Sequence, residues 1–235
     1  MPSKTKPVVQ RDWSETQRMV VRGDGETADA GGIDGAFARA GAGGTALSGR
    51  AGVASVGRGG TATVAEPGVA LVTADTGTAH QTGGRGIACC IHNGTAIADT
   101  VGIATSGEQA KAGDCGIASV YKTRTRGAEA GRGGIAVAWS GGDATAGDGG
   151  VAVAGTIRLL PNPQPPTPYT ATAGQGGVAV AFHGGQVSAG EGGVIVIIEE
   201  LANGDLKAHC APVSAGSAYA PHVRYKLSNG TIIPA

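Results

Sequence analysis

Hydrophobic positions recur along this chain in short alternating runs that are separated by glycine, from about residue 35 to residue 198. The unit is an octamer with glycine first, alanine third and a further small residue fifth, as in the runs that begin at Gly52 and Gly60. Alternation with a period of two predicts a β-strand, and the following glycines predict a tight bend. A unit repeated so often indicates a stacked, repetitive architecture.

The second position of the octamer divides the repeats into two alternating classes, so the true repeat is about 16 residues long. The odd octamers place an apolar residue there: Phe37, Val53, Val69, Ile87, Ile103, Ile117, Ile135, Val151, Val178 and Val194. The even octamers place a polar or charged residue there: Thr45, Thr61, Thr78, Thr95, Lys111, Glu129, Asp143, Thr170 and Gln186. We therefore expect two chemically different strands in each repeat.

These patterns predict an all-β fold, a parallel β-solenoid with two short strands in each turn of about 16 residues. About ten turns at the usual strand spacing would make a rod roughly 48 Å long. Each strand presents its third and fifth positions on one face, and these positions hold small residues in both classes. They are Ala88/Cys90, Ala104/Ser106, Ala136/Ala138 and Ala179/Ala181 in odd octamers, and Ala62/Val64, Ala96/Ala98, Ala144/Ala146 and Ala171/Ala173 in even ones. We expect these residues inside a narrow coil, although the inverted assignment, with Val and Ile inside, stays open.

On that assignment the two outer faces differ. Even octamers turn polar residues such as Thr61 and Thr63 outward, whereas odd octamers turn out apolar ones. Because a soluble monomer rarely exposes a long apolar face, we expect a second copy to cover it and the protein to be a homo-oligomer. The candidate interface residues are Ile87, Ile91, Ile117, Tyr121, Ile135, Val137, Trp139, Val178 and Phe182.

The ends of the repeat suggest three segments: an N-terminal arm or cap over residues 1–34, the solenoid over 35–198 and a small β cap over 199–235. Val194 to Ile198 are apolar on both strand faces, and Asn203-Gly204 and Asn229-Gly230 are typical hairpin turns. A proline-rich insertion at 156–168 interrupts the repeat and forms a loop, because proline cannot donate to a strand ladder. That loop either binds a protein partner or merely decorates a corner.

Composition excludes several classes of function. Eighteen basic residues balance eighteen acidic ones, which argues against nucleic-acid binding. With neither an apolar signal segment nor a membrane-length apolar run, we expect no membrane partner and a cytoplasmic location, or a place in a phage or secreted assembly reached by a non-Sec route. The four cysteines, Cys89, Cys90, Cys115 and Cys210, lack metal-ligand spacing and are expected to be small buried thiols.

The octamers Gly-Thr-Ala-Thr-Val-Ala-Glu-Pro and Gly-Val-Ala-Val-Ala-Phe-His-Gly, with the closing Gly-Val-Ile-Val-Ile-Ile-Glu-Glu, resemble uncharacterised bacterial and phage Gly/Ala-rich octapeptide-repeat β-solenoid proteins. That resemblance, which spans about residues 40 to 235, brings no known catalytic residues. The alternation of 16 residues also looks like ice-nucleation repeats and like the heads of trimeric adhesins. The first would want a regular Thr-x-Thr ladder, yet only Thr61/Thr63 and Thr170/Thr172 supply both threonines.

Candidate chemistry is sparse, since phosphate-binding, nucleophile-elbow and zinc-protease motifs are all missing from the sequence. The histidines are scattered, and only His209, Cys210 and His222 could converge, in the cap. The acids favour corners, where solvation explains them: Glu66, Asp99, Glu108, Asp114, Asp148 and Glu191. We therefore predict no catalytic residue, cofactor or metal, and a non-enzymatic structural or protein-interaction role. The alternatives are binding of ice or a polymer surface through the Thr-bearing sheet, and an enzyme with a site in the cap or near the proline-rich loop.

Overall fold

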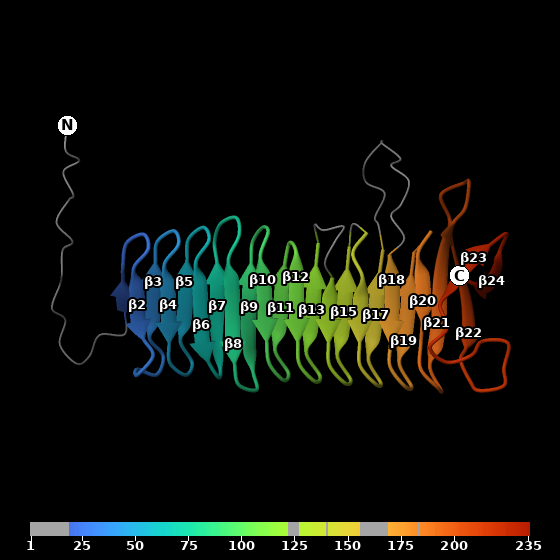
Figure 1. The fold of residues 1–235 in the computed structure, drawn as a ribbon, viewed down its shortest axis with the longest axis horizontal. Coiled ribbons are helices and arrows are strands. Elements are labelled where there is room, and N and C mark those ends of the chain that lie inside the picture. The colour runs from blue at the N-terminus through green and yellow to red at the C-terminus, as the bar shows by residue number, and fades with distance from the viewer. Residues whose placement is uncertain (1–18, 122–126, 140, 156–168, 183) are drawn as a thin grey trace.

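The chain forms a straight rod of stacked two-stranded coils, with β2 and β3 near one end and β22 to β24 at the other (Figure 1). The computed structural model describes residues 19–121, 127–139, 141–155, 169–182 and 184–235. Within them lie two 12-stranded sheets, one holding the odd-numbered strands up to β21 together with β22, and the other holding the even-numbered strands up to β20 together with β23 and β24. We call these the odd sheet and the even sheet. The prediction of an all-β parallel solenoid with two strands per turn is confirmed.

Strands of the odd sheet are four or five residues long through most of the rod. In spatial order they are β1 (Met19–Val21), β3 (Phe37–Ala40), β5 (Val53–Val56), β7 (Gly68–Val72), β9 (Gly86–Cys90), β11 (Ile103–Ser106), β13 (Ile117–Val120), β15 (Ile135–Ala138), β17 (Val151–Ala154), β19 (Val178–Ala181), β21 (Val194–Glu200) and β22 (Leu206–Pro212).

Strands of the even sheet alternate with them along the chain, so that each turn contributes one strand to each sheet. They are β2 (Thr27–Ala30), β4 (Thr45–Ser48), β6 (Thr61–Ala65), β8 (Thr78–Thr82), β10 (Thr95–Ala98), β12 (Gln109–Ala112), β14 (Ala128–Ala130), β16 (Ala144–Ala146), β18 (Thr170–Ala173), β20 (Gln186–Ser188), β23 (Tyr225–Ser228) and β24 (Thr231–Pro234).

The parallel ladder begins inside the segment that we assigned to an N-terminal arm or cap. Strand β1 pairs in parallel with β3, and β2 pairs in parallel with β4, although both lie within residues 1–34. The first turn of the solenoid therefore starts at Met19. Residues 1–18 and the proline-rich insertion at 156–168 lie outside the described residues.

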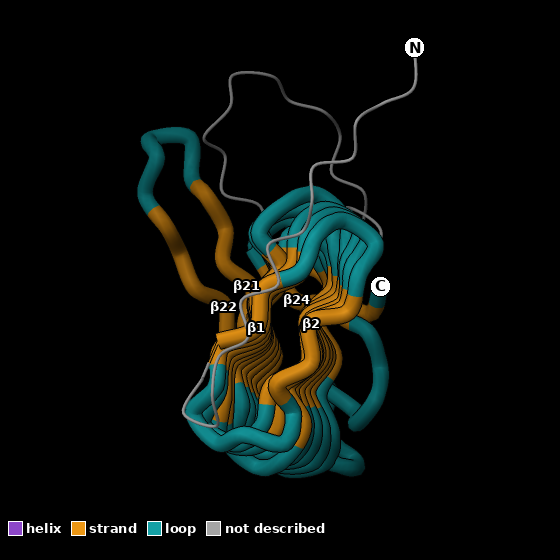
Figure 2. The backbone as a smooth tube through the Cα atoms, turned by 90° about the vertical axis from the view of Figure 1, so that its left-hand side faces the viewer, coloured by secondary structure: helices purple, strands orange, loops and turns teal. Residues whose placement is uncertain are grey.

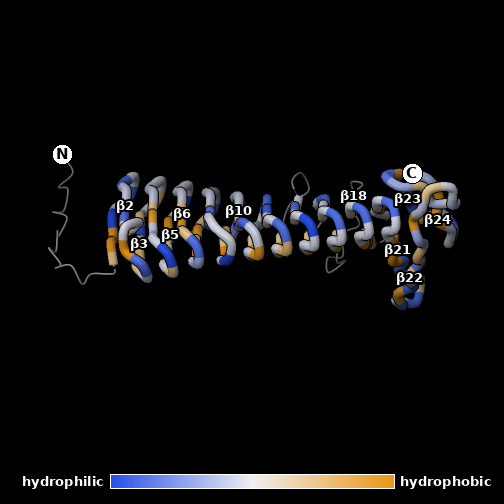
Figure 3. Tube along the Cα trace, turned by 90° about the horizontal axis from the view of Figure 1, so that it is seen from below, coloured by the Kyte–Doolittle hydropathy of each residue, from blue (hydrophilic) through white to orange (hydrophobic). Residues whose placement is uncertain are grey.

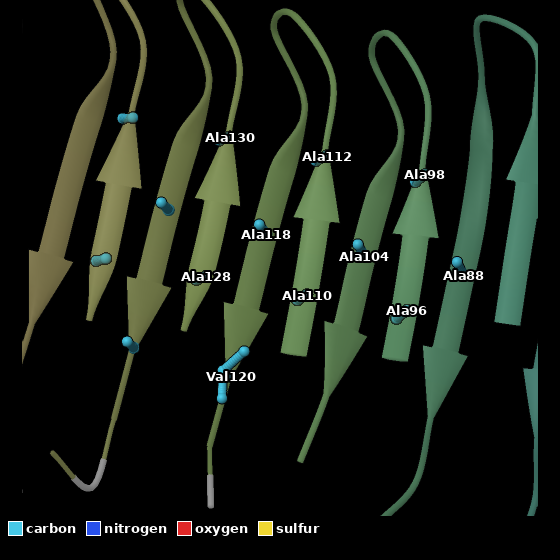
Figure 4. Close-up of a cluster of buried hydrophobic side chains, with 14 of the residues drawn as sticks. Ala88, Ala96, Ala98, Ala104, Ala110, Ala112, Ala118, Val120, Ala128 and Ala130 are labelled. Atoms are coloured by element: carbon cyan, nitrogen blue, oxygen red, sulfur yellow. The ribbon is translucent and has the colours of Figure 1, made fainter. Parts of the chain in front are cut away.

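Alanine fills the interior of the coil. The third-position alanines of both sheets are buried, as Ala104 and Ala136 are in the odd sheet and Ala96 and Ala144 in the even sheet. Figure 4 shows alternating strands of the two sheets contributing these small side chains to one core. All the residues that we expected inside are buried, so the inverted assignment is wrong. Side chains this short allow the two sheets to approach more closely than the usual spacing of about 10 Å.

Glycine at the first octamer position is required by the stacking of the turns. A Cβ added at Gly134 would lie 2.8 Å from the carbonyl oxygen of Gly116, and one at Gly150 would lie 2.8 Å from that of Gly134. The same approach occurs before an even strand, where a Cβ at Gly60 would lie 2.6 Å from the carbonyl oxygen of Gly44. The glycines before the strands of each sheet thus form a column, in which the backbone of each turn packs directly against the backbone of the turn before.

Two antiparallel hairpins close the C-terminal end of the rod. Strand β21 pairs in parallel with β19 and antiparallel with β22, and β23 pairs antiparallel with both β20 and β24. Asn229 and Gly230 both have positive φ angles, 48° and 72°, as a type I′ turn requires. Larger side chains replace alanine here, because Ile195, Ile197, Val213 and Tyr225 are buried and close the core. The predicted β cap is present in the structure.

Candidate interaction surface

The outer face of the odd sheet carries an unbroken apolar column. Its members stand at the second octamer position and are in register from strand to strand: Met19, Phe37, Val53, Val69, Ile87, Ile103, Ile117, Ile135, Val151, Val178 and Val194. The four isoleucines of the middle turns each expose between 39% and 41% of their surface. Branched side chains stacked at strand spacing make this face flat and apolar.

The neighbouring column, at the fourth position, is also uncharged over most of the rod. From β5 to β21 it reads Ser55, Leu71, Cys89, Thr105, Ser119, Val137, Val153, Val180 and Val196. Its one charged residue in the solenoid is Arg39 on β3, near the N-terminal end of the described chain. We call the second and fourth positions of β1 to β22 together the odd face.

The three aromatic residues predicted at the margin of this face, together with Ile91, form two pairs, and each pair spans a glycine where the sixth position lacks a side chain. The order of this column is Ile91, Gly107, Tyr121, Trp139, Gly155 and Phe182. Across Gly107, the Tyr121 hydroxyl donates a hydrogen bond to the carbonyl oxygen of Ile91.

Across Gly155, the rings of Trp139 and Phe182 lie 6.2 Å apart between centroids and are tilted by 52°. A Cβ at Gly155 would lie 2.6 Å from a ring carbon of Phe182, so the ring fills the space that the glycine leaves. The predicted interface aromatics therefore also make contacts within one chain. The glycine that stands between two large side chains at the sixth position was the signal that could have revealed this.

The outer face of the even sheet is polar, and its N-terminal half carries a column of threonines. Thr27, Thr45, Thr61, Thr78 and Thr95 are in register on five consecutive strands.

Lys111 and Glu129 do not continue this column, contrary to our assignment. Gln109 follows Thr95 in register, and Lys111 aligns with Ile97, two residues further along its strand. The corner before β12 is only two residues long, whereas the corner before β10 has four, and this shift accounts for the error at Lys111. Lys111 and Glu129 form an ion pair at 2.8 Å on adjacent strands.

Several corner acids bind the backbone of a neighbouring turn. A carboxylate oxygen of Asp114 accepts a hydrogen bond from the backbone N–H of Arg132 at 2.9 Å, and one of Asp148 accepts from Gln175 at 2.8 Å. Glu191 accepts likewise from Ala215, and Asp99 from Gly83, both at 2.8 Å. The Arg132 guanidinium also contacts Asp114 and lowers the pKa of that carboxyl. These acids connect neighbouring turns, beyond the simple solvation that we expected.

The cysteines divide between the interior and the surface. Cys90 points inward and is buried, and this burial raises the pKa of its thiol to about 11. Cys89 points outward on the odd face, and partial burial raises its pKa as well. Neither thiol is therefore a reactive thiolate at neutral pH. Our expectation of buried thiols is wrong for Cys115 and Cys210, which are exposed.

The predicted convergence of His209, Cys210 and His222 does not occur as a ligand cluster. Among the described residues, no group of three or more His, Cys, Asp or Glu side chains could hold a metal ion. His209 instead contacts Glu199, with its Nε2 atom 2.8 Å from the carboxylate, inside the β21–β22 hairpin. Within the same part of the chain, no helix is long and apolar enough to cross a membrane.

No family model, no curated protein and no solved structure matches the chain.

Proposed function

We propose that this protein is a non-enzymatic structural or interaction module that associates with itself through the odd face. The observation that supports this is the second-position column, which runs apolar through eleven strands beside a fourth-position column without charge from β5 to β21. Interface cores are depleted of charge, and strands with one face in water normally place polar residues on that face. The even sheet of the same rod follows the normal pattern.

The dimensions of the odd face suit a second copy of the chain. Ten strands at about 4.8 Å and four residues at about 3.3 Å give a face of roughly 50 by 13 Å, or about 600 Å² on each copy. Specific interfaces start at about 600 Å² per partner, and about 800 Å² is typical. An identical flat face with the same strand spacing is complementary to itself, so a two-fold symmetric dimer covers the odd face of both copies at once.

Sedimentation velocity of the wild type and two aspartate variants tests the proposal. Ile103→Asp places a charge on the odd face, and Thr95→Asp places the same charge at the second position of the even strand in the same turn. We expect an oligomeric wild type, at least tenfold weaker association for Ile103→Asp and unchanged association for Thr95→Asp. A monomeric wild type, or equal behaviour of the two variants, would contradict the proposal. Ile103 is preferred to Trp139 because Trp139 also contacts Phe182 within the chain.

The threonine column favours a second candidate function, binding of ordered water or a repetitive polymer surface. Five in-register hydroxyl groups at about 4.8 Å spacing present a periodic array of donors and acceptors. Thermal hysteresis of the wild type, lost in Thr61→Val and Thr78→Val, would support this function. Freezing behaviour equal to that of an inert protein would contradict this second function.

A further inference from the structure

The β21–β22 hairpin breaks the uniform outline of the rod. Its two strands are seven residues long, against four or five in the other strands of the odd sheet from β3 to β19. Seen along the rod, the hairpin leans out of the coil on the side of the odd sheet (Figure 2). The view from below shows the same projection at the C-terminal end (Figure 3). The odd face is therefore flat along the rod but bounded by a projecting hairpin at one end.

This projection discriminates between the two ways of stacking odd faces about a two-fold axis. With both rods running in the same direction, the two hairpins would meet at one end and hold the faces apart. With the rods antiparallel, each hairpin lies beside the first turns of the other copy, where no such projection is present among the described residues. Close contact of the faces is therefore compatible with the antiparallel arrangement.

The two ends that this arrangement brings together expose complementary side chains. The hairpin exposes Leu206 at 64%, and the first strand exposes Met19 at 60% and Val21 at 47%. These are large fractions for apolar side chains, and covering them by the other copy would add buried area to a face that is itself at the lower limit for a specific interface.

Charge is also complementary between these ends. Glu200 and Asp205 are exposed on the hairpin beside one basic residue, Lys207, while Arg22 and Arg39 are exposed at the start of the odd sheet. Asp24 lies in the same corner as Arg22, but its carboxylate already accepts a hydrogen bond from Ala42. Rim charges of opposite sign favour one orientation over another, even where they contribute little to affinity.

We propose that two copies pack odd face to odd face with their rods antiparallel, and that the β21–β22 hairpin of each copy covers the first turn of the other. This inference rests on the proposed self-association and specifies its geometry. The two-fold axis runs along the strands, so each octamer position faces the same position in the partner. Val21 and Cys210 end the same fourth-position column at opposite ends of the rod, and they therefore face each other between copies.

Cross-linking with a short bismaleimide tests this geometry. Val21→Cys adds a thiol on the odd face of the first turn, and Thr27→Cys adds one on the even face of the same turn as a matched control. We expect Val21→Cys to yield at least tenfold more covalent dimer than Thr27→Cys or the wild type. The linked peptides should join residue 21 to Cys210, and Cys210→Ser should abolish the product. Within one chain these positions lie on β1 and β22, the two edge strands of the odd sheet, so the link must be intermolecular.

The outcomes separate this inference from the proposed function. A wild type that is monomeric by sedimentation velocity overturns self-association itself. An oligomer that links Cys210 to Cys210, or in which folded, oligomeric Val21→Cys gives no link to Cys210, overturns only the antiparallel geometry.

Discussion

The two sheets of this rod share one interior and differ on the outside. Inside, alanine at the third position is buried in the odd sheet at Ala136 and in the even sheet at Ala144. Outside, the second position holds isoleucine or valine in the middle of the odd sheet and threonine in the N-terminal half of the even sheet. Two strands with the same backbone and the same core thus face different surroundings.

This difference shows which residues the coil itself requires. Close stacking of turns requires glycine at the first position and small residues at the third, and both sheets meet this requirement equally. The second position projects away from the core and is free to follow the environment of each face. A consistent chemical difference at this position therefore reports on the surroundings of the rod, and it motivates the proposed interface.

Overpacking the interior should have the largest effect on stability, and the same effect in both sheets. Ala136→Leu and Ala144→Leu should each lower the free energy of unfolding by about 3 kcal/mol, because neither site has room for the added carbons. Urea denaturation followed by far-UV circular dichroism measures this. Val137→Leu, whose side chain points outward, is the control and should change stability by less than about 1 kcal/mol. A large difference between the stability losses at the two alanine sites would mean that the interiors of the two sheets are not equally packed.

Adding a methyl group to the glycine column should cost somewhat less. Gly134→Ala, before an odd strand, and Gly60→Ala, before an even strand, should each lower the free energy of unfolding by about 2 kcal/mol through the clash with a carbonyl oxygen. Gly149→Ala should cost only about 1 kcal/mol, because its Cβ meets no atom and only its positive φ is unfavourable. Equal losses at all three sites in thermal denaturation would mean that stacking does not require glycine at the first position.

Relieving backbone strain in a corner should raise stability slightly. Val101 has a φ of 60°, a value that glycines adopt in equivalent corners and that branched residues rarely do. Val101→Gly should increase the free energy of unfolding by about 1 kcal/mol, since the left-handed conformation then costs nothing. Differential scanning calorimetry should show a higher Tm, while association stays unchanged because the corner lies off the odd face. A lower Tm would show that the valine side chain stabilises the corner.

The ion pair of the even face should matter least. Lys111 and Glu129 are about half exposed, and such pairs contribute at most about 0.5 kcal/mol. Lys111→Ala should therefore change the free energy of unfolding by no more than that amount, and high salt should remove the difference. A loss above about 1 kcal/mol in urea denaturation would mean that the even face, too, depends on specific contacts.

Much of the fold could be predicted because the size of the residue at each octamer position indicates where that residue lies in the coil. Glycine, alanine and a period of two indicate the strand, the bend and the interior together. The first turn was missed because Met19-Val20-Val21 and Thr27-Ala28-Asp29 lack the leading glycine of the octamer. Lys111 and Glu129 were displaced because the length of a corner depends on backbone paths that side-chain patterns do not report.

The candidate surface was predictable in its composition but not in its details. Alternation alone predicted the apolar odd face with five of its residues, and four more at its margin, because strand geometry places them there. It did not reveal that Trp139 reaches Phe182 over Gly155, since that contact depends on side-chain direction across two turns. Nor did it reveal the outward lean of the β21–β22 hairpin, which depends on how the last strands leave the coil.

Hydroxyl-radical footprinting of the wild-type protein tests most directly whether the odd face is covered in solution. Ile103 and Ile117 expose about as much surface as each other in one copy, and Ile97 on the even face serves as the internal reference. With the face covered, Ile103 and Ile117 should be oxidised several times less than Ile97 at high protein concentration, and the protection should disappear on dilution below the dissociation constant. Oxidation of the two odd-face isoleucines at least as fast as Ile97 at every concentration would contradict the account.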